Sequence, residues 1–158
     1  MVLALDDKCT ECICQGKGIG FSVIKGQSLN ASSIERIFYP ETQAESNRWQ
    51  ALFAEMPESL IELGQNVIDV ATNVYHLNLP DRVLLPICDH MQGAIERYRQ
   101  GIVINNPMLE DIKRIYPNEY LAGQDAVKKI KDYSGIEMLE DEAAFLAYHF
   151  VIHGLGRN

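Results

Sequence analysis

The chain has 158 residues, of which 47% are hydrophobic and 23% are charged, and its formal net charge is −8. This composition is typical of a globular protein and excludes a largely disordered chain, while the acidic balance excludes a broad nucleic-acid-binding surface. No apolar run approaches the roughly 20 residues that a membrane-spanning helix needs. The N-terminus shows no signal peptide, so we expect a cytoplasmic protein without membrane insertion.

The first 39 residues predict a small antiparallel sheet, because short runs rich in β-branched and aromatic residues alternate with turns. The expected strands are Val2–Leu5, Cys9–Gln15, Phe21–Ile24 and Ile34–Tyr39. A sheet of this size buries little apolar area, so we expect it to need a packing partner for stability.

A glycine-rich turn, Gly16–Phe21, is the most informative feature of this part. Its three alternating glycines let the backbone bend sharply and approach a ligand closely. Lys17 supplies a positive charge for a phosphate, and Phe21 supplies a flat face on which a base can stack. A hairpin turn without any ligand is the alternative on the turn alone. A dinucleotide-binding fingerprint is excluded, because its third glycine would fall on Phe21 and no strand–helix–strand unit surrounds the turn.

Four cysteines are present, with Cys9, Cys12 and Cys14 close together and Cys88 far away. Cys9 and Cys12 have the spacing of a metal or redox motif, but no second cysteine pair or nearby histidine completes a four-ligand site. Cys12 and Cys14 point to the same face of a strand, so we expect them to pack as small core residues. We therefore expect no metal site and no cofactor.

Residues 40–47 are polar and aperiodic, which predicts a linker. From there to its end the chain has a helical pattern of apolar residues. Pro86 predicts either a delayed first turn or a kink in the second of these helices. The expected helices are residues 60–74, one that starts at Pro80-Asp81, Met108–Tyr116, Pro117–Tyr133, and Glu140–Gly154.

Two histidines fall on the buried faces of these helices. His90 and His149 lie three and four residues from apolar neighbours, so both side chains should point inward. Asp89 and Glu142 are carboxylates at hand to orient an imidazole. An inward histidine suits a hydrogen-bonded core residue, a phosphoacceptor or proton-transfer group, or a metal ligand, and the residues alone leave these alternatives open. His149 and His153 have metal-ligand spacing, but they lack the glutamate of an H-E-x-x-H motif and a third ligand.

Several motifs in the same order make the chain resemble the BglG/LicT family of bacterial transcription antiterminators, and the resemblance covers nearly the whole chain. The early motifs are similar to the co-antiterminator RNA-binding domain: Gly16–Phe21 and Ser33–Phe38. The later motifs are similar to one PTS-regulation domain: Asp89–Met91, Ala94–Tyr98, Asn106–Leu109, Ile112–Pro117 and Glu140–His149.

The resemblance implies an α+β chain of two modules. A small antiparallel β-sheet RNA-binding module, partial in extent, would occupy residues 1–45, and an all-α five-helix PTS-regulation domain would occupy residues 46–158. Members of the family usually have one further strand before the position of Met1, with an Asn-bearing turn that also touches RNA. They usually have a second regulatory domain after the position of Asn158, and commonly Gly at the position of Ala144.

The resemblance also implies a function, that of an RNA-binding transcription antiterminator for a sugar-utilisation operon. A homodimer would bind a hairpin in nascent mRNA, block an overlapping terminator and let transcription continue, without acting as an enzyme. Phosphate from the phosphocarrier HPr and a sugar-specific enzyme II of the sugar phosphotransferase system would regulate it. Carried over by position, the implied RNA-binding residues are Gly16, Lys17, Gly18 and Phe21, and the implied phosphorylation sites are His90 and His149.

The sequence leaves two alternatives open. The first is a phosphorylation-dependent protein-interaction module that has lost RNA binding. The second is a metal-dependent helical enzyme that uses His90, His149 and His153.

Overall fold

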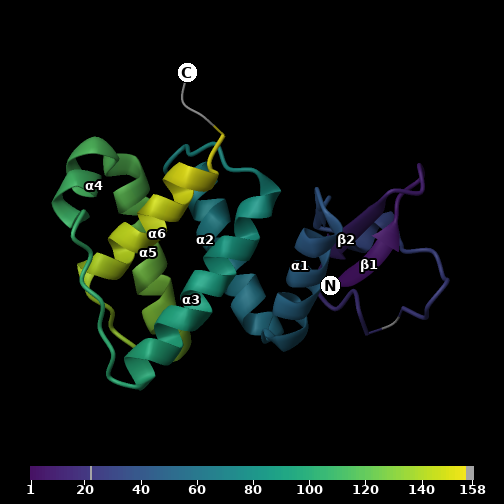
Figure 1. Cartoon of the computed structure of the whole chain (residues 1–158), viewed down its shortest axis with the longest axis horizontal. Helices are drawn as coiled ribbons and strands as arrows, with labels where there is room; N and C mark the ends of the chain where they lie inside the picture. The colour runs from purple at the N-terminus through teal and green to yellow at the C-terminus, as the bar shows by residue number, and fades with distance from the viewer. Residues whose placement is uncertain (22, 156–158) are drawn as a thin grey trace. The chain divides into compact units, whose positions relative to one another are not determined.

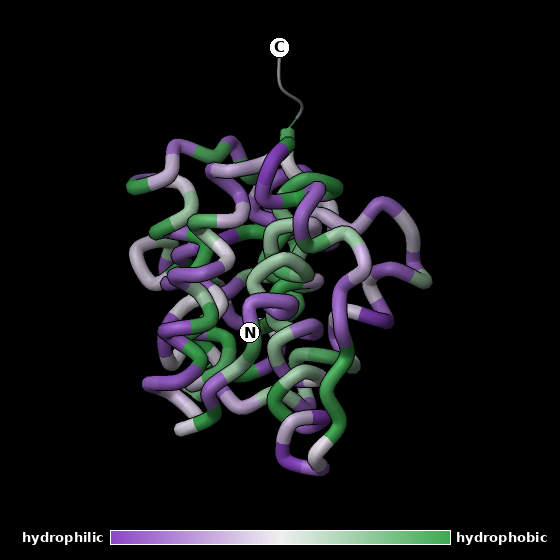
Figure 2. The backbone as a smooth tube through the Cα atoms, turned by 90° about the vertical axis from the view of Figure 1, so that its left-hand side faces the viewer, coloured by the Kyte–Doolittle hydropathy of each residue, from purple (hydrophilic) through white to green (hydrophobic). Residues whose placement is uncertain are grey.

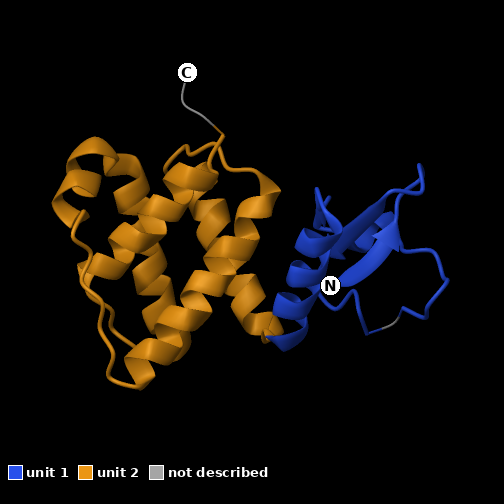
Figure 3. Cartoon of the chain, in the orientation of Figure 1, with its two compact units in different colours: residues 1–55 blue, residues 56–158 orange. Residues whose placement is uncertain are grey.

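A computed structural model describes residues 1–21 and 23–155 and divides the chain into two compact units, Met1–Glu55 and Met56–Asn158 (Figures 1 and 3). The first unit contains a three-stranded antiparallel sheet and one α-helix, and the second is helical. This confirms the α+β fold class expected from the sequence.

The sheet consists of β1 (Val2–Leu5), β2 (Glu11–Gln15) and β3 (Arg36–Phe38), with β2 in the centre. Both pairings are antiparallel, and Ile13 lies opposite Leu3 on one side and Phe38 on the other. A short 3₁₀ turn, η1 (Ala31–Ser33), precedes β3.

The second strand starts later than the predicted Cys9, because the turn before it is longer. The Asp6 carboxylate accepts hydrogen bonds from the backbone nitrogens of Lys8 (2.9 Å) and Thr10 (2.8 Å). The same turn places Cys9 at a φ of 61°, which is incompatible with a strand. Cys9 is consequently exposed, whereas Cys12 and Cys14 are buried side by side, as predicted.

The predicted strand Phe21–Ile24 is absent among the described residues, and a backbone turn lies at each end of the segment. The backbone nitrogen of Phe21 donates to the carbonyl of Gly18 (3.2 Å), and that of Gln27 donates to the carbonyl of Ile24 (3.0 Å). Ser22, which was part of the predicted strand, lies outside the described residues.

The predicted linker is wrong, because helix α1 (Gln43–Glu55) begins inside it. The hydroxyl of Thr42 accepts a hydrogen bond from the Glu45 backbone nitrogen at 3.0 Å, as an N-cap residue does. The Glu45 carboxylate in turn accepts one from the backbone nitrogen of Glu41 at 2.8 Å. Polar residues therefore start this helix rather than forming a loop.

Helix α1 supplies the packing partner that the small sheet was expected to need. Phe38 of β3 contacts Trp49 edge-on, with ring centroids 5.9 Å apart, and lies 6.4 Å from the ring of Phe53. All three rings are buried. On the sheet, a separate cluster forms around Cys12, Cys14 and Ile19.

Five α-helices form the described part of the second unit, which agrees with the expected five-helix domain. They are α2 (Glu58–Asn73), α3 (Leu84–Arg99), α4 (Leu109–Ile115), α5 (Pro117–Ser134) and α6 (Glu140–His153), and a 3₁₀ turn, η2 (Asp81–Val83), precedes α3.

Pro86 occupies the third position of α3, where its missing N–H has no helical partner to lose. The delayed first turn is therefore the correct one of the two expectations.

Helices α5 and α6 lie side by side (Figure 1). Gly123 of α5 lies directly against the carbonyl of Ala143 in α6, and a Cβ at this glycine would collide with that oxygen. Ala143 and Ala147 extend the contact with small buried side chains and pack with Tyr120. Helix α6, which carries His149, also packs against α3 and α4.

Hydrophobic and hydrophilic residues are interspersed along the described part of the chain, without a long hydrophobic stretch (Figure 2). Across residues 1–21 and 23–155, no helix is both long and apolar enough to cross a membrane.

Candidate functional site

The glycine turn of the first unit is held close to the segment before β3. Gly16 lies against the backbone carbonyl of Ser33, and a Cβ at position 16 would collide with it. The carbonyl of Gly16 accepts a hydrogen bond from the backbone nitrogen of Ile19 at 3.2 Å. Ile19 is buried against Cys12 and Cys14 of β2, so its side chain anchors the turn.

The two side chains that the sequence assigned to a ligand project from this anchored turn. The Phe21 ring is 87% exposed, although an aromatic ring of this size usually packs in the interior. Lys17 is exposed as well, and its backbone nitrogen donates to the Glu35 carboxylate at 3.4 Å. Gly16, Lys17, Gly18 and Phe21 thus lie together in one turn, with a cation and a flat apolar face open to solvent.

The second unit brings the two predicted histidines together across α3 and α6. The ring centroids of His90 and His149 are 5.0 Å apart. His153, one turn further along α6, is exposed but stacks on His149, with ring centroids 5.7 Å apart and an interplanar angle of 6°.

A buried glutamate orients the first of these histidines. Glu142 of α6 is completely buried, and its Oε2 atom lies 2.9 Å from Nε2 of His90. Its Oε1 atom accepts hydrogen bonds from both terminal nitrogens of Arg97, each at 3.2 Å. The first turn of α6 also favours a negative charge. Glu142 therefore acts on His90 in the opposite helix and not on His149 in its own, and the other candidate carboxylate, Asp89, is exposed.

His149 lies in a less polar environment. Burial, and then the neighbouring His90 and His153, lower the pKa of His149 to about 4. Burial, and then Arg82, also lower the pKa of His153. The Nδ1 atom of His149 is buried and has no hydrogen-bond partner within the described ranges. The ring is therefore neutral near pH 7, which is the form with a free lone pair.

Arg97 is a site residue that the histidine pattern did not identify. It lies seven residues after His90 on the same helix, and two helical turns place both side chains on one face. That spacing, together with the need of a buried carboxylate for a cationic partner, is the signal that would have identified it.

The metal-enzyme alternative finds no support in this cluster. Within the part of the chain that the structure describes, no group of three or more His, Cys, Asp or Glu side chains is arranged to hold a metal ion.

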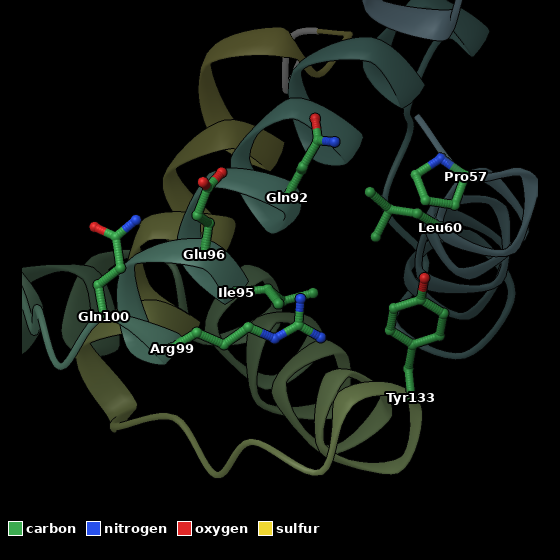
Figure 4. A pocket seen from close by; sticks show the side chains of 8 residues that line it. All are labelled: Pro57, Leu60, Gln92, Ile95, Glu96, Arg99, Gln100 and Tyr133. Carbon is green, nitrogen blue, oxygen red and sulfur yellow. The ribbon is translucent and has the colours of Figure 1, made fainter. Parts of the chain in front are cut away.

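A separate pocket of about 390 Å³ lies in the second unit, between α2, α3 and the end of α5 (Figure 4). Arg99 and Tyr133 reach into it from opposite sides, and Leu60 and Ile95 form its apolar wall. None of the histidines lines it, so the pocket and the histidine cluster are distinct features.

Comparison with known proteins covers both units. The family model for the PRD domain matches residues 65–152, and the model for the CAT RNA binding domain matches residues 1–47.

Relatives with curated descriptions match along nearly the whole chain. The beta-glucoside operon antiterminator of Dickeya chrysanthemi is 32% identical over 151 residues, which are 96% of this chain and 53% of the relative. The transcription antiterminator LicT of Bacillus subtilis (strain 168) is 27% identical over 151 residues, covering 96% of this chain and 54% of LicT. The chain thus spans about half the length of these relatives.

A solved structure, "Crystal structure of GlcT CAT-PRDI", shares the fold with a TM-score of 0.80 at 26% sequence identity. The match covers 96% of this chain and 90% of that one.

Proposed function

Because the chain belongs to the BglG/LicT family, in which a CAT RNA-binding domain precedes a PRD domain, we propose that it is an RNA-binding transcription antiterminator for a sugar-utilisation operon. In this proposal the first unit binds a hairpin in nascent mRNA that overlaps a terminator. The second unit regulates that binding through histidine phosphorylation.

The glycine turn supports the RNA-binding part of the proposal. RNA loops and bulges are recognised by stacking on aromatic rings and by hydrogen bonds, which an exposed ring on an anchored turn can provide. The chain is acidic overall, so a few placed groups must make the contact. We assign this role to Gly16, Lys17, Gly18 and Phe21. Two copies in a homodimer would double the number of cations that face the RNA.

The histidine cluster supports the regulatory part. A phosphoryl group on His90 or His149 adds about two negative charges at the contact between α3 and α6, by analogy with other phosphorylated residues. The buried carboxylate of Glu142 already occupies this contact, so the added charge meets repulsion and favours a rearrangement. We propose the phosphocarrier HPr and a sugar-specific enzyme II of the phosphotransferase system as the donors.

The same assignment indicates the general class of the protein and the compartment in which it acts. The relatives are described as antiterminators, so we propose a binding protein that is not an enzyme. Nascent mRNA and the phosphate donors are found in the cytoplasm, so we propose that the protein acts there.

The observation that carries the proposal is that one chain combines an exposed aromatic ring beside a lysine in the first unit with an enclosed histidine pair in the second. A gel-shift assay with a terminator-overlapping hairpin tests it, using a hairpin of scrambled loop sequence as the control. We expect specific retention that weakens as salt rises. Treatment with phosphoenolpyruvate, enzyme I and HPr should change that retention or the subunit association.

Two outcomes would contradict the proposal. If the hairpin is not retained while the histidines accept phosphate, the chain is instead a phosphorylation-dependent interaction module. If both modified and unmodified forms bind the hairpin equally with the same subunit association, the regulatory part fails.

A further inference from the structure

We propose that the two histidines of the cluster accept a phosphoryl group on different ring nitrogens, His90 on Nδ1 and His149 on Nε2, and that Glu142 imposes the choice on His90. This inference rests on the proposed regulation by phosphate, because it concerns the chemistry of the same two side chains.

The contact between His90 and Glu142 fixes the position of a proton. Nε2 of His90 lies 2.9 Å from Oε2 of Glu142. A carboxylate only accepts hydrogen bonds, so Nε2 must carry the hydrogen. A neutral imidazole has one N–H, and its lone pair then resides on Nδ1. The nucleophilic nitrogen of His90 is therefore Nδ1.

Arg97 prevents the glutamate from moving away from His90. Its guanidinium donates two hydrogen bonds to Oε1 of Glu142, while Oε2 faces the histidine. Both carboxylate oxygens are thus engaged, and the side chain is completely buried. A phosphoryl group on Nε2 would have to occupy the position of a buried carboxylate, which places two anions at one point.

The geometry of His149 leads to the opposite nitrogen. Its Nδ1 atom is buried and has no partner among the residues that the structure describes. A phosphoryl donor cannot reach a buried atom, so the remaining nitrogen, Nε2, is the one available on this partly exposed ring. For Nε2 to react, the ring proton must lie on Nδ1, and no carboxylate in residues 1–21 or 23–155 accepts a hydrogen bond from Nδ1. We therefore expect His149 to react more slowly than His90.

The transfer to His90 balances without a further reactant. The lone pair of Nδ1 forms a bond to phosphorus, while the bond from phosphorus to the nitrogen of the donor breaks and its electron pair returns to the donor. The proton on Nε2 stays in its hydrogen bond to Glu142, which stabilises the positive charge that develops on the ring. Glu142 is accordingly a positioning residue for this transfer.

The first test reads the tautomer in the unmodified protein. Long-range ¹H–¹⁵N NMR of protein labelled with ¹⁵N-histidine distinguishes a protonated ring nitrogen from one with a free lone pair. We expect His90 to carry its proton on Nε2. A His90 protonated on Nδ1 would overturn the inference, whether or not phosphate regulates the protein.

The second test uses potassium phosphoramidate, a small donor that needs no partner protein, on His90→Ala and His149→Ala variants. Correlation of ¹H with ³¹P identifies the phosphorylated nitrogen. We expect Nδ1-phosphohistidine in His149→Ala and Nε2-phosphohistidine in His90→Ala. Modification of the same nitrogen in both, or of neither histidine, contradicts the inference. Labelling by phosphoramidate but not by HPr would contradict only the proposed regulation.

The third test distinguishes a role of Glu142 in positioning the His90 ring from a purely structural role. In the His149→Ala background, Glu142→Gln preserves the shape of the side chain but removes its charge. We expect labelling of His90 to slow about tenfold or more and to lose its preference for Nδ1. Arg97→Lys keeps a cation beside Glu142 and should retain the preference for Nδ1. Glu140→Gln, two residues before Glu142 and exposed on α6, should change neither the labelling rate nor the nitrogen that is labelled. Unaltered rate and nitrogen choice in Glu142→Gln would rule out the assigned role.

Discussion

The two candidate sites differ in how far their functional side chains are exposed to solvent. The glycine turn exposes its ring and its cation, has a backbone pinned by close contacts, and suits a large ligand that arrives from solvent. The histidine cluster holds its charged groups between α3 and α6 and suits a covalent modification, such as phosphorylation, that alters the contacts among His90, Glu142 and Arg97. The difference indicates that side-chain loss at the turn should affect binding with little effect on stability, whereas loss in the cluster should affect stability first.

The strongest effect should come from removing the buried carboxylate. Glu142→Ala leaves Arg97 and His90 without their shared partner, and we expect the free energy of unfolding of the second unit to fall by about 3 kcal/mol or more. Urea unfolding followed by far-ultraviolet circular dichroism measures this. Glu140→Ala is the control: its ion pair with Lys113 (2.8 Å) is surface-exposed and should contribute little to stability. Equal losses in both variants would erase the distinction between buried and exposed carboxylates.

The next effect tests whether the turn is pinned. Gly16→Ala forces a methyl group against the carbonyl of Ser33, and we expect a loss of about 2–3 kcal/mol in the first unit. The fluorescence of Trp49, which is the single tryptophan and packs against Phe38 of β3, reports unfolding of this unit. Gly20→Ala is the matched control, because the nearest atom to its added Cβ is 3.8 Å away. A stable Gly16→Ala protein would show that the turn adapts and is not anchored.

Binding should respond to the exposed ring. Phe21→Ala removes a surface on which one base can stack, a contact that contributes about 1–3 kcal/mol, so hairpin affinity should fall roughly 5- to 150-fold. Because the ring is exposed, the free energy of unfolding should change by less than about 0.5 kcal/mol. Ile24→Ala, at another exposed apolar position, should leave affinity unchanged. Equal affinity of Phe21→Ala and the parent protein would remove the ring from the RNA site.

The smallest effect is a pH dependence that belongs to the cluster. The pKa of His149 is lowered to about 4, so the folded state resists protonation while the unfolded chain takes up a proton below about pH 6.5. Its contribution to stability is fully present above that pH and is lost as the pH falls toward 4. Since the ring is partly exposed, we expect a loss of about 1–2 kcal/mol, below the ideal value for such a shift. Urea midpoints at pH 7.5 and pH 5 measure it, and His149→Gln should lose less stability over the same interval. An identical loss in both proteins would assign the pH dependence to other groups.

Features that depend on local periodicity were predictable from the sequence. The helices α2 and α4–α6 lie close to their predicted ranges, because apolar residues at three- and four-residue spacing and Pro or Gly at the ends specify them. The family resemblance and the fold class are confirmed. Helix α1 was missed because its first turn is polar, although the pair Thr42 and Glu45 carried a helix-start signal.

Features that depend on contacts between distant segments were not predictable in the same way. Glu142 was a candidate to orient an imidazole, but its partner lies 52 residues earlier on α3, a pairing that the packing of α3 against α6 decides. The pairing of Arg97 with Glu142 spans 45 residues and depends on the same packing. The described residues of Phe21–Ile24 do not form the predicted strand, because backbone turns, which residue propensity describes poorly, bound the segment at Gly18–Phe21 and at Ile24–Gln27.

The contact of Gly123 with Ala143 has a mechanical consequence. At the point where two helices touch through their main chains, no side chain lies between them that could change rotamer and absorb a displacement. We therefore expect α5 and α6 to move together as one rigid body when a force acts on either helix. His90 lies on α3, and its link to α6 runs through the tips of side chains, which yield far more easily. A repulsive force introduced between these histidines would accordingly open the bundle along the α3–α6 seam and leave the α5–α6 pair intact.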